Sequence, residues 1–332
     1  MNIPGVSIVI PTYNRAELLP RAVAAVQAQT YAHWELIVVD DASTDHTAQL
    51  VTALAGADPR IRLIRNTGAV GPGGARNTGL AQCRASWVAF LDSDDTWQPE
   101  KLARFVAEAD ARPDAVLIGS DYWMIDRDRN RRETMLEFLH REMIPWWENE
   151  PDISAIVPCN AIKADPAILA SHDVMLSTQI AQFLWVHTSS AMVRLEPVRR
   201  LGGFDARLTQ TEDIKLWLQL SELGPVIFIP EPLATYDITG RDVGSGERYA
   251  RHEAARKPSL YPTRRYHLDL MRWLKAHPGL TAAQRRVLRH QTVDGYRRCA
   301  EAARGCRPFP VFLFHRLAGS HRFRKFTGAF GL

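Results

Sequence analysis

The sequence predicts an α/β protein with a mostly parallel central sheet flanked by helices and a helical C-terminal extension. Three observations support this prediction. Short β-branched runs alternate with segments whose apolar residues recur at helical spacing. A glycine-rich loop at residues 68–74 stands between one such run and the next helix, and residues beyond 245 become helical and basic in composition. Strands and helices that alternate at this pace are typical of βαβ units, which build parallel sheets.

The alternation is clearest in the N-terminal third. Strands are expected at residues 6–10, 36–39, 61–64 and 87–91, and helices at 16–29, 43–54 and 75–84. Asn14 is expected to cap the first helix, and Ser43 or Thr44 the second, because short polar side chains satisfy free backbone N–H groups at helix starts.

We divide the chain into a first domain at 1–245 and a helical, basic extension at 246–332. The first domain is expected to contain one half at 1–120, an insertion at 121–186 that lies over the site, and a second half at 187–240. The insertion has no clean periodicity. Regularity returns with strands at 189–193 and 226–229 and with a helix at 211–223.

Composition excludes several classes of protein. Apolar residues make up 46% and charged residues 23% of the 332, which is typical of a globular protein, and a net charge of +4 is too small to indicate nucleic-acid binding. No apolar run is long enough to span a membrane, and the N-terminus lacks the features of a signal peptide. The four scattered cysteines support neither a disulfide framework nor a zinc site. We therefore expect a cytoplasmic protein.

Asp92, Ser93, Asp94 and Asp95 directly follow the fourth expected strand. Two carboxylates about 4 Å apart repel each other by roughly 4 kcal/mol at an effective dielectric constant near 20, so such a group needs a cation or full hydration. Its hard oxygen ligands suit Mg²⁺ or Mn²⁺. Taken alone, an acidic turn that caps the next helix is the better interpretation.

Polar residues at the other strand ends favour the cation site over the acidic turn, because ligands of parallel sheets bind outside the carboxyl ends of the strands. The first strand is followed by Pro11, Tyr13 and Asn14, and the second ends in Asp40 and Asp41. One of the two aspartates can cap the next helix while the other accepts a hydrogen bond from a base or a ribose. Tyr13 is expected either to stack on a nucleobase or to be a partly buried core residue.

The glycine loop continues into Arg76 at the start of a helix. Free N–H groups at such a position favour an anion, and an arginine can neutralise a phosphate oxygen. The loop has neither the fingerprint of a dinucleotide-binding fold nor that of a P-loop. Asp213 lies in the first turn of another expected helix and is a candidate general base, although carboxylates favour first turns on dipole grounds alone.

Four segments in this order resemble the nucleotide-binding half of family 2 glycosyltransferases. They read SIVIPTYNR at 7–15, VVDDASTD at 38–45, GARNTGL at 74–80 and FLDSDD at 90–95. Gly203-Phe204-Asp205, followed by Thr211-Glu212-Asp213, is similar to the acceptor half of that family. The resemblance covers roughly residues 4–240.

The resemblance implies a GT-A fold and a metal-dependent enzyme that transfers a sugar, with inversion, from a nucleotide-diphosphate-sugar to an acceptor hydroxyl, in the assembly of cell-surface polysaccharide or glycoconjugate. It implies that Asp213 is the base, that Asp41 binds the nucleobase and that Asp92 and Asp94 hold Mg²⁺ or Mn²⁺. The remaining residues expected to bind the donor are Pro11, Tyr13, Asn14, Asp40, Arg76 and Ser93. Glu212 and Trp217 are expected on the acceptor side.

One segment departs from the family pattern. Family members often carry Tyr-Arg-x-His after the last strand, whereas this chain reads Tyr236-Asp237-Ile238-Thr239. The third metal ligand is therefore open: Asp237 is expected to substitute as a ligand, or Arg241 to reach the diphosphate instead. The alternatives to a glycosyltransferase are a nucleotidyltransferase and a non-catalytic protein that binds sugar nucleotides.

The C-terminal extension is the last distinctive feature. Between residues 285 and 325 it holds eleven Arg and Lys against two acidic residues. Residues 281–304 are expected to form solvated helices, whereas 308–326 interleave aromatic and basic residues and are expected to contact an anionic membrane surface. This would place the enzyme on the inner face of the membrane, beside a lipid-linked acceptor.

Overall fold

The computed structural model describes residues 4–128, 130–181, 185–208, 211–237, 270–290 and 292. Their centre is a nine-stranded sheet in which β7 (Arg131–Thr134) pairs only with β6. The other strands follow one another across the sheet in the order β3 (Ile61–Arg65), β2 (Trp34–Asp40), β1 (Val6–Thr12), β4 (Trp87–Phe90), β8 (Ala191–Arg194), β6 (Leu117–Asp126), β9 (Val226–Asp237) and β5 (Thr96–Trp97).

The pairing divides the sheet into two parts. The first four strands of the chain pair in parallel, as the alternation predicted. Beyond β4 the sheet is mixed, because β8 runs antiparallel to both β4 and β6, while β6 and β9 are parallel. The α/β fold is confirmed, and the parallel arrangement holds for the N-terminal half.

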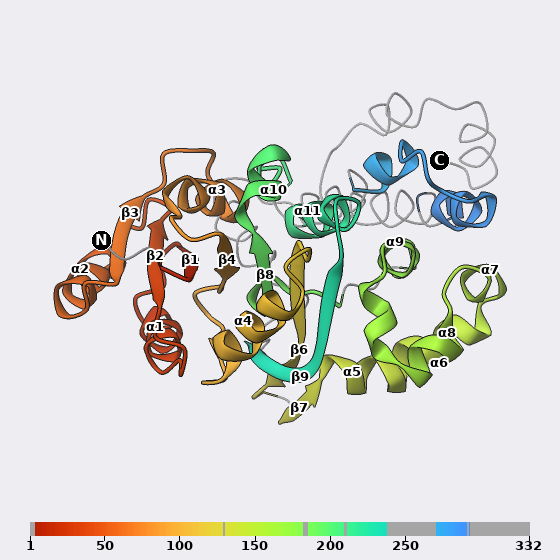
Figure 1. The fold of residues 1–332 in the computed structure, drawn as a ribbon, viewed down its shortest axis with the longest axis horizontal. Coiled ribbons are helices and arrows are strands. Elements are labelled where there is room, and N and C mark those ends of the chain that lie inside the picture. Colours follow the sequence, from red (N-terminus) through yellow and green to blue (C-terminus); the bar gives the residue numbers. More distant parts are fainter. Residues whose placement is uncertain are drawn as a thin grey trace, which may run out of the picture.

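Helices cover both sides of this sheet (Figure 1). On one side lie α3 (Pro72–Gln82), α10 (Leu195–Arg200) and α11 (Glu212–Ser221), and on the other lie α1 (Leu19–Gln27) and α4 (Lys101–Ala111). The helix α2 (Thr47–Ala57) packs near the β3 edge. The strands β1, β2 and β4 are fully buried between these layers, which explains their continuous apolar runs.

Two helix caps differ from the prediction. Asn14 has a φ of 50°, and its side-chain oxygen accepts a hydrogen bond of 2.7 Å from the N–H of Thr44. The N–H of Asn14 in turn donates to Ser43 Oγ at 2.9 Å. These residues therefore join the loop after β1 to the loop after β2, and the two helices begin later, at Leu19 and Thr47.

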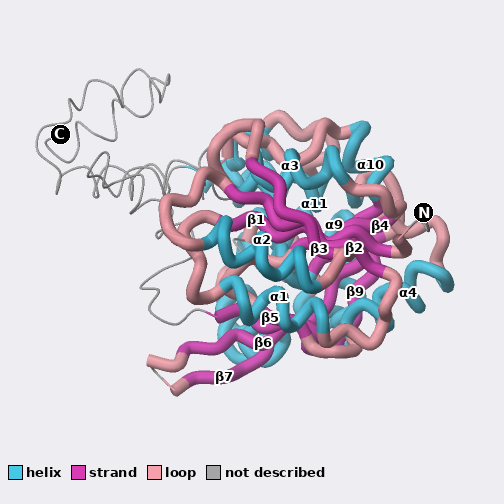
Figure 2. The backbone as a smooth tube through the Cα atoms, turned by 90° about the vertical axis from the view of Figure 1, so that its left-hand side faces the viewer, coloured by secondary structure: helices cyan, strands magenta, loops and turns pink. Residues whose placement is uncertain are grey.

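The insertion differs at its start, since β6 continues to Asp126 and residues 121–126 belong to the central sheet. Figure 2 shows that β6 and β7 project beyond α1 as a hairpin. Short helices follow in the order α5 (Met135–Phe138), η1 (Leu139–Met143), α6 (Ile144–Asn149), α7 (Pro151–Ser154), α8 (Cys159–Ala164), η2 (Pro166–Ala170) and α9 (His172–Ile180), with η3 (Thr188–Ser190) before β8. Helical residues at 270–275 and 282–290 lie beside α9 (Figure 1).

Candidate active site

The carboxyl ends of β1 and β2 carry the first part of the site. The two ends are joined by a hydrogen bond of 2.8 Å from the N–H of Asp41 to the carbonyl oxygen of Thr12. Asp40 accepts from the N–H of Ser43 at 3.1 Å and so stabilises the turn after β2. Of the other residues expected here, Pro11 is buried and Tyr13 is half-buried.

Asp41 connects the end of β2 to the glycine loop. Its buried carboxylate accepts hydrogen bonds from Asn66 Nδ2 at 2.6 Å and from the N–H of Gly71 at 2.8 Å. Gly71 has a φ of 118°, which favours glycine. Gly74 is also required, because a Cβ there would lie 1.8 Å from the carbonyl oxygen of Ala69. Asp41 therefore fixes the shape of the loop as well as facing the sheet edge.

Arg76 lies between the two halves of the site rather than open to a phosphate. It is 3% exposed, and its Nη2 donates to Asp92 at 2.7 Å while its Nη1 donates to Glu212 at 2.6 Å. Burial disfavours the charged guanidinium, but Asp92 and Glu212 outweigh this and raise the pKa of Arg76. Arg76 thus stays charged and holds a carboxylate from each half.

Glu212 is the second carboxylate that Arg76 contacts. Burial and the neighbouring Asp213 raise the pKa of Glu212 to about 7, although Arg76 acts in the opposite direction. Glu212 was expected on the acceptor side, and the structure places it in the interior.

The carboxylates of the acidic segment after β4 have different surroundings. Asp95 is buried and accepts from Ser189 Oγ at 2.6 Å, and Asp94 lies 3.8 Å from Arg15 Nη2. Ser93, which stands between Asp92 and Asp94 in the chain, is also buried. The N–H of Asp92 donates to Ser189 Oγ at 3.0 Å, so this serine contacts both ends of the segment.

His187 adds a ligand that the sequence did not indicate. One ligand atom each from Asp92, Asp95 and His187 lies within 4.8 Å of the other two, which fits a divalent cation. The predicted ligand Asp92 is in this group, whereas Asp94 is not. No motif in the chain indicated His187, because it is more than ninety residues away from the aspartates.

Asp213 lies in the first turn of α11, as predicted. Its Oδ2 accepts from Thr188 Oγ1 at 2.6 Å and its Oδ1 from the N–H of Ile214 at 2.8 Å. Thr211, which precedes the helix, has a φ of 87° in the left-handed region. The carboxylate is therefore fixed from two sides and lies next to the carboxylate held by Arg76.

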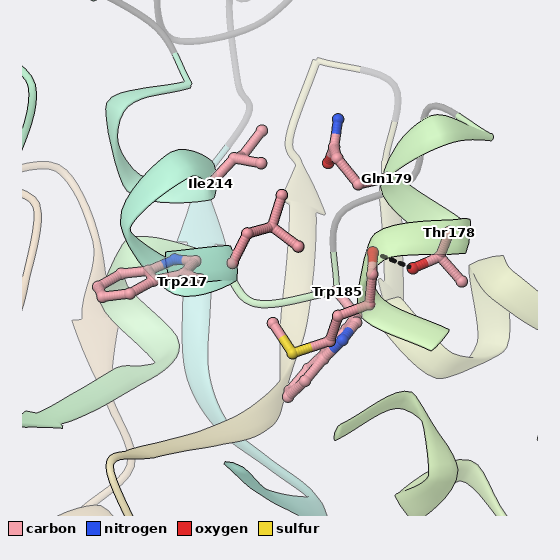
Figure 3. Close-up of a pocket in the computed structure, with 7 residues that line it drawn as sticks. Thr178, Gln179, Trp185, Ile214 and Trp217 are labelled. Atoms are coloured by element: carbon pink, nitrogen blue, oxygen red, sulfur yellow. Dashed lines mark hydrogen bonds between the residues drawn. The ribbon is translucent and has the colours of Figure 1, made fainter. Parts of the chain in front are cut away.

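Trp217 points into the core instead of toward an open acceptor surface. It is 0% exposed, and its ring lies 6.1 Å from Phe90 and 5.9 Å from Phe204, centroid to centroid. It also lines a pocket between α11 and α9, opposite Gln179 and beside Trp185 (Figure 3). In that pocket Gln179 Oε1 and both indole N–H groups are buried and have no hydrogen-bond partner among the described residues.

The segment that departs from the family pattern is described only as far as Asp237. Its carboxylate lies 3.4 Å from both Arg21 and Arg127, and its N–H donates to Asp95 at 3.3 Å. Arg241, the expected alternative contact to the diphosphate, lies outside the described residues, as do the C-terminal residues 308–326. None of the helices in the described part of the chain combines the length and apolar character that a membrane span requires.

Comparison with known proteins finds similarity to glycosyltransferases. Residues 7–163 match the family model described as Glycosyl transferase family 2. Over 109 residues the chain is 46% identical to the succinoglycan biosynthesis protein ExoO of Rhizobium meliloti, a match that covers 33% of this chain and 31% of that protein. Over 97 residues it is 46% identical to the UDP-Glc:alpha-D-GlcNAc-diphosphoundecaprenol beta-1,3-glucosyltransferase WfgD of Escherichia coli, covering 29% and 38% of the two chains. The chain thus spans about a third of the length of these relatives.

A solved structure supports the same fold. The mannosyltransferase PcManGT from Pyrobaculum calidifontis, solved in complex with GDP-Man and Mn²⁺, superimposes with a TM-score of 0.57 at 19% identity, covering 98% of this chain and 83% of that one.

Proposed function

We propose, from the premise that this chain belongs to glycosyl transferase family 2, that it transfers a sugar from a nucleotide-diphosphate-sugar to an acceptor hydroxyl with inversion, in the assembly of cell-surface polysaccharide. The observation that carries the proposal is the bridge formed by Arg76. It joins Asp92, at the donor end of β4, to Glu212, the neighbour of the candidate base Asp213. A donor held at one carboxylate would therefore lie close to the base.

The residues of this chain can perform the reaction in one displacement. Asp213 takes the proton from the acceptor hydroxyl, and the freed oxygen attacks the anomeric carbon on the face opposite the diphosphate. The bond between that carbon and the diphosphate oxygen breaks, and its electron pair leaves with the diphosphate. Thr188, which donates to Oδ2 of Asp213, orients the carboxylate for this transfer.

A metal ion fits the chemistry of the donor set at the end of β4. Asp92, Asp95 and His187 would hold Mg²⁺ or Mn²⁺, and the bound ion would act as a Lewis acid on the leaving diphosphate. Asp94 remains a predicted ligand from the resemblance, and Asp41 the predicted contact to the base. PcManGT was solved with GDP-Man and Mn²⁺, which supports a donor of this class.

The experiment that tests the proposal follows nucleoside diphosphate release. The full chain is mixed with a series of UDP- and GDP-sugars and Mn²⁺, with and without lipid-linked saccharide acceptors. Acceptor-dependent release from one donor is expected. Binding of a donor without release would support the non-catalytic alternative, and pyrophosphate release from a nucleoside triphosphate and a sugar phosphate would support the nucleotidyltransferase.

A lipid-linked acceptor would bring the enzyme to the membrane surface. WfgD is named for transfer to a diphosphoundecaprenol-linked sugar, and residues 308–326 of this chain are basic and aromatic. Each basic residue near an anionic leaflet contributes about 1 kcal/mol. Replacement of Arg322, Arg324 and Lys325 by glutamine should therefore weaken flotation with anionic liposomes and leave that with neutral liposomes unchanged. Equal flotation of both proteins, or flotation that is indifferent to salt, would contradict the membrane role.

A further inference from the structure

A second group of metal-ligating side chains lies apart from the candidate active site. His172 begins α9, Glu222 directly follows α11, and His277 follows the helical residues 270–275. One ligand atom from each of the three lies within 4.8 Å of the other two. We propose that His172, Glu222 and His277 bind a divalent transition-metal ion, with zinc the preferred ion, and that the ion fastens the C-terminal helices to the catalytic domain.

The hydrogen bonds of His172 prepare it to be a ligand. Ser221 Oγ donates its one proton to the carbonyl oxygen of Leu218 at 2.7 Å. It must therefore accept in its contact of 2.8 Å with His172 Nδ1, so the proton of this contact belongs to the imidazole. In neutral His172 the other nitrogen, Nε2, then carries a lone pair. Metal-binding histidines are typically oriented in this way, by a hydrogen bond from the nitrogen that does not bind the metal.

The other two members are already in contact. His277 Nε2 and Glu222 Oε1 are 2.8 Å apart, and the side chain of His277 is only 10% exposed. The rings of His172 and His277 lie 5.9 Å apart, centroid to centroid, and are tilted by 33°. Glu222 is 42% exposed, which gives an ion a route from solvent.

Two imidazoles and one carboxylate are ligand types that zinc prefers, and three protein ligands are a number that zinc sites commonly have. Zinc takes nitrogen and oxygen ligands at about 2.0–2.2 Å in a tetrahedron, and three protein ligands leave one position for water. This site supplies two imidazoles and one carboxylate, whereas Asp92, Asp95 and His187 supply one imidazole and two carboxylates, so this site is expected to prefer zinc more strongly. The free glutamate–histidine pair would have to open around the ion, which side-chain rotation can accomplish.

The position of the group gives it a structural role. It joins the start of α9, the end of α11 and the C-terminal helical residues, which lie next to one another in Figure 1. A second contact already links α9 to the C-terminal helices, because Gln284 Nε2 donates to Ser177 Oγ at 3.0 Å. An ion that binds only the folded chain stabilises it by mass action. The inference does not depend on the proposed sugar transfer.

The test measures zinc bound to the full chain after tag removal and metal stripping. Chains with His172→Gln, Glu222→Gln and His277→Gln are compared with the parent by equilibrium dialysis and elemental analysis. The matched control is His290→Gln, which removes a surface imidazole that is 70% exposed. One zinc per chain is expected for the parent and the control, and an affinity lower by more than about 100-fold for the three variants.

Two further measurements keep the test independent of folding defects. Co²⁺ bound to the parent should give the intense visible absorption of a tetrahedral site, and zinc should raise the melting temperature of the parent but not of His172→Gln. Asp92→Asn should retain the zinc. The proposal is overturned if the parent binds no zinc, if all variants bind it equally, or if Asp92→Asn alone loses it.

Discussion

Two buried glutamates, one from each half of the molecule, are held in opposite ways. Glu35 on β2 accepts from Ser7 Oγ at 2.7 Å, and from the N–H and Nε of Arg84 at 2.9 and 2.8 Å. Burial alone would raise the pKa of Glu35, but the hydrogen bonds from Ser7 and Arg84 lower it. For Glu212 burial prevails and the pKa rises to about 7, even with Arg76 in contact.

The positions of the hydrogen-bond partners along the chain explain why the pKa values of the two glutamates shift in opposite directions. Those of Glu35 all come from the first 84 residues, so this half can satisfy its own buried charge. The partner of Glu212 is 136 residues away, in the other half. The charge balance of the proposed catalytic region therefore exists only when the two halves are packed together. Four predictions test this contrast.

Arg76→Ala should have the largest effect. It leaves Asp92 and Glu212 without their shared cation, and removal of one partner from a buried ion pair costs about 3–5 kcal/mol. We expect a decrease of that size in the free energy of unfolding, measured in urea, together with loss of turnover.

The matched variant in the first half is Arg84→Ala. Glu35 would keep Ser7 and Arg62, so the loss should be only about 1 kcal/mol. Arg200→Ala, on a side chain that is 65% exposed, should stay within about 0.5 kcal/mol of the parent. Equal losses for Arg76→Ala and Arg84→Ala would remove the contrast between the halves.

Asp94→Asn should abolish turnover and the metal-dependent binding of nucleoside diphosphate without loss of stability. Removal of one charge relieves repulsion within the acidic segment, so the melting temperature of the metal-free protein should hold or rise. Calorimetric titration with UDP or GDP, with and without Mn²⁺, measures the binding. Asp110→Asn on the exposed surface of α4 is the control. Parental metal-dependent binding in the Asp94 variant would assign the ion to Asp92, Asp95 and His187 alone.

Asp213→Asn should reduce turnover by about 10²–10⁴-fold, the usual contribution of a general base, while donor affinity stays close to that of the parent. The measurement is nucleoside diphosphate release at saturating donor. Asp173→Asn is the matched control, since Asp173 is also an acidic residue in the first turn of a helix but lies on the exposed start of α9. Equal turnover in both variants would show that Asp213 is not the base and that it only interacts favourably with the helix dipole.

The sequence predicted the first half more fully than the second, for a physical reason. Strands β1 to β4 are short apolar runs separated by helices, and their parallel pairing brings Asp41 and Asp92 to one edge without further information. Asn14 was predicted to cap a helix because short polar side chains do so at helix starts, but its left-handed φ places it in a turn that joins two loops.

The rest of the site could not be predicted because it depends on long-range packing. His187 joins the acidic group from beyond the insertion, and Arg76 meets Glu212 across 136 residues. Neither contact leaves a spacing pattern in the chain. Trp217 was expected on the acceptor side, but its ring packs against Phe90 and Phe204 in the core.

The last prediction concerns pH and Asp121, a buried residue on β6. Burial raises the pKa of Asp121 from 3.8 to about 6, although the N–H groups of Tyr122 and Leu136 favour the charged form. A carboxyl group whose pKa is higher in the folded state contributes stability at low pH and loses it as the pH rises. The free energy of unfolding should therefore fall by about 2 kcal/mol from this group alone between pH 4 and pH 8.

Asp121→Asn should remove that part of the pH dependence, because the amide oxygen still accepts from Tyr122 but does not titrate. Glu35→Gln provides the comparison from the first half and should act with the opposite sign. The pKa of Glu35 is lowered on folding, so its contribution is present above the unfolded pKa of 4.5 and lost as the pH falls. The deficit of Glu35→Gln relative to the parent should accordingly shrink toward low pH. Urea unfolding at a series of pH values measures both, and parallel curves for the two variants would show that Asp121 and Glu35 are held in the same way.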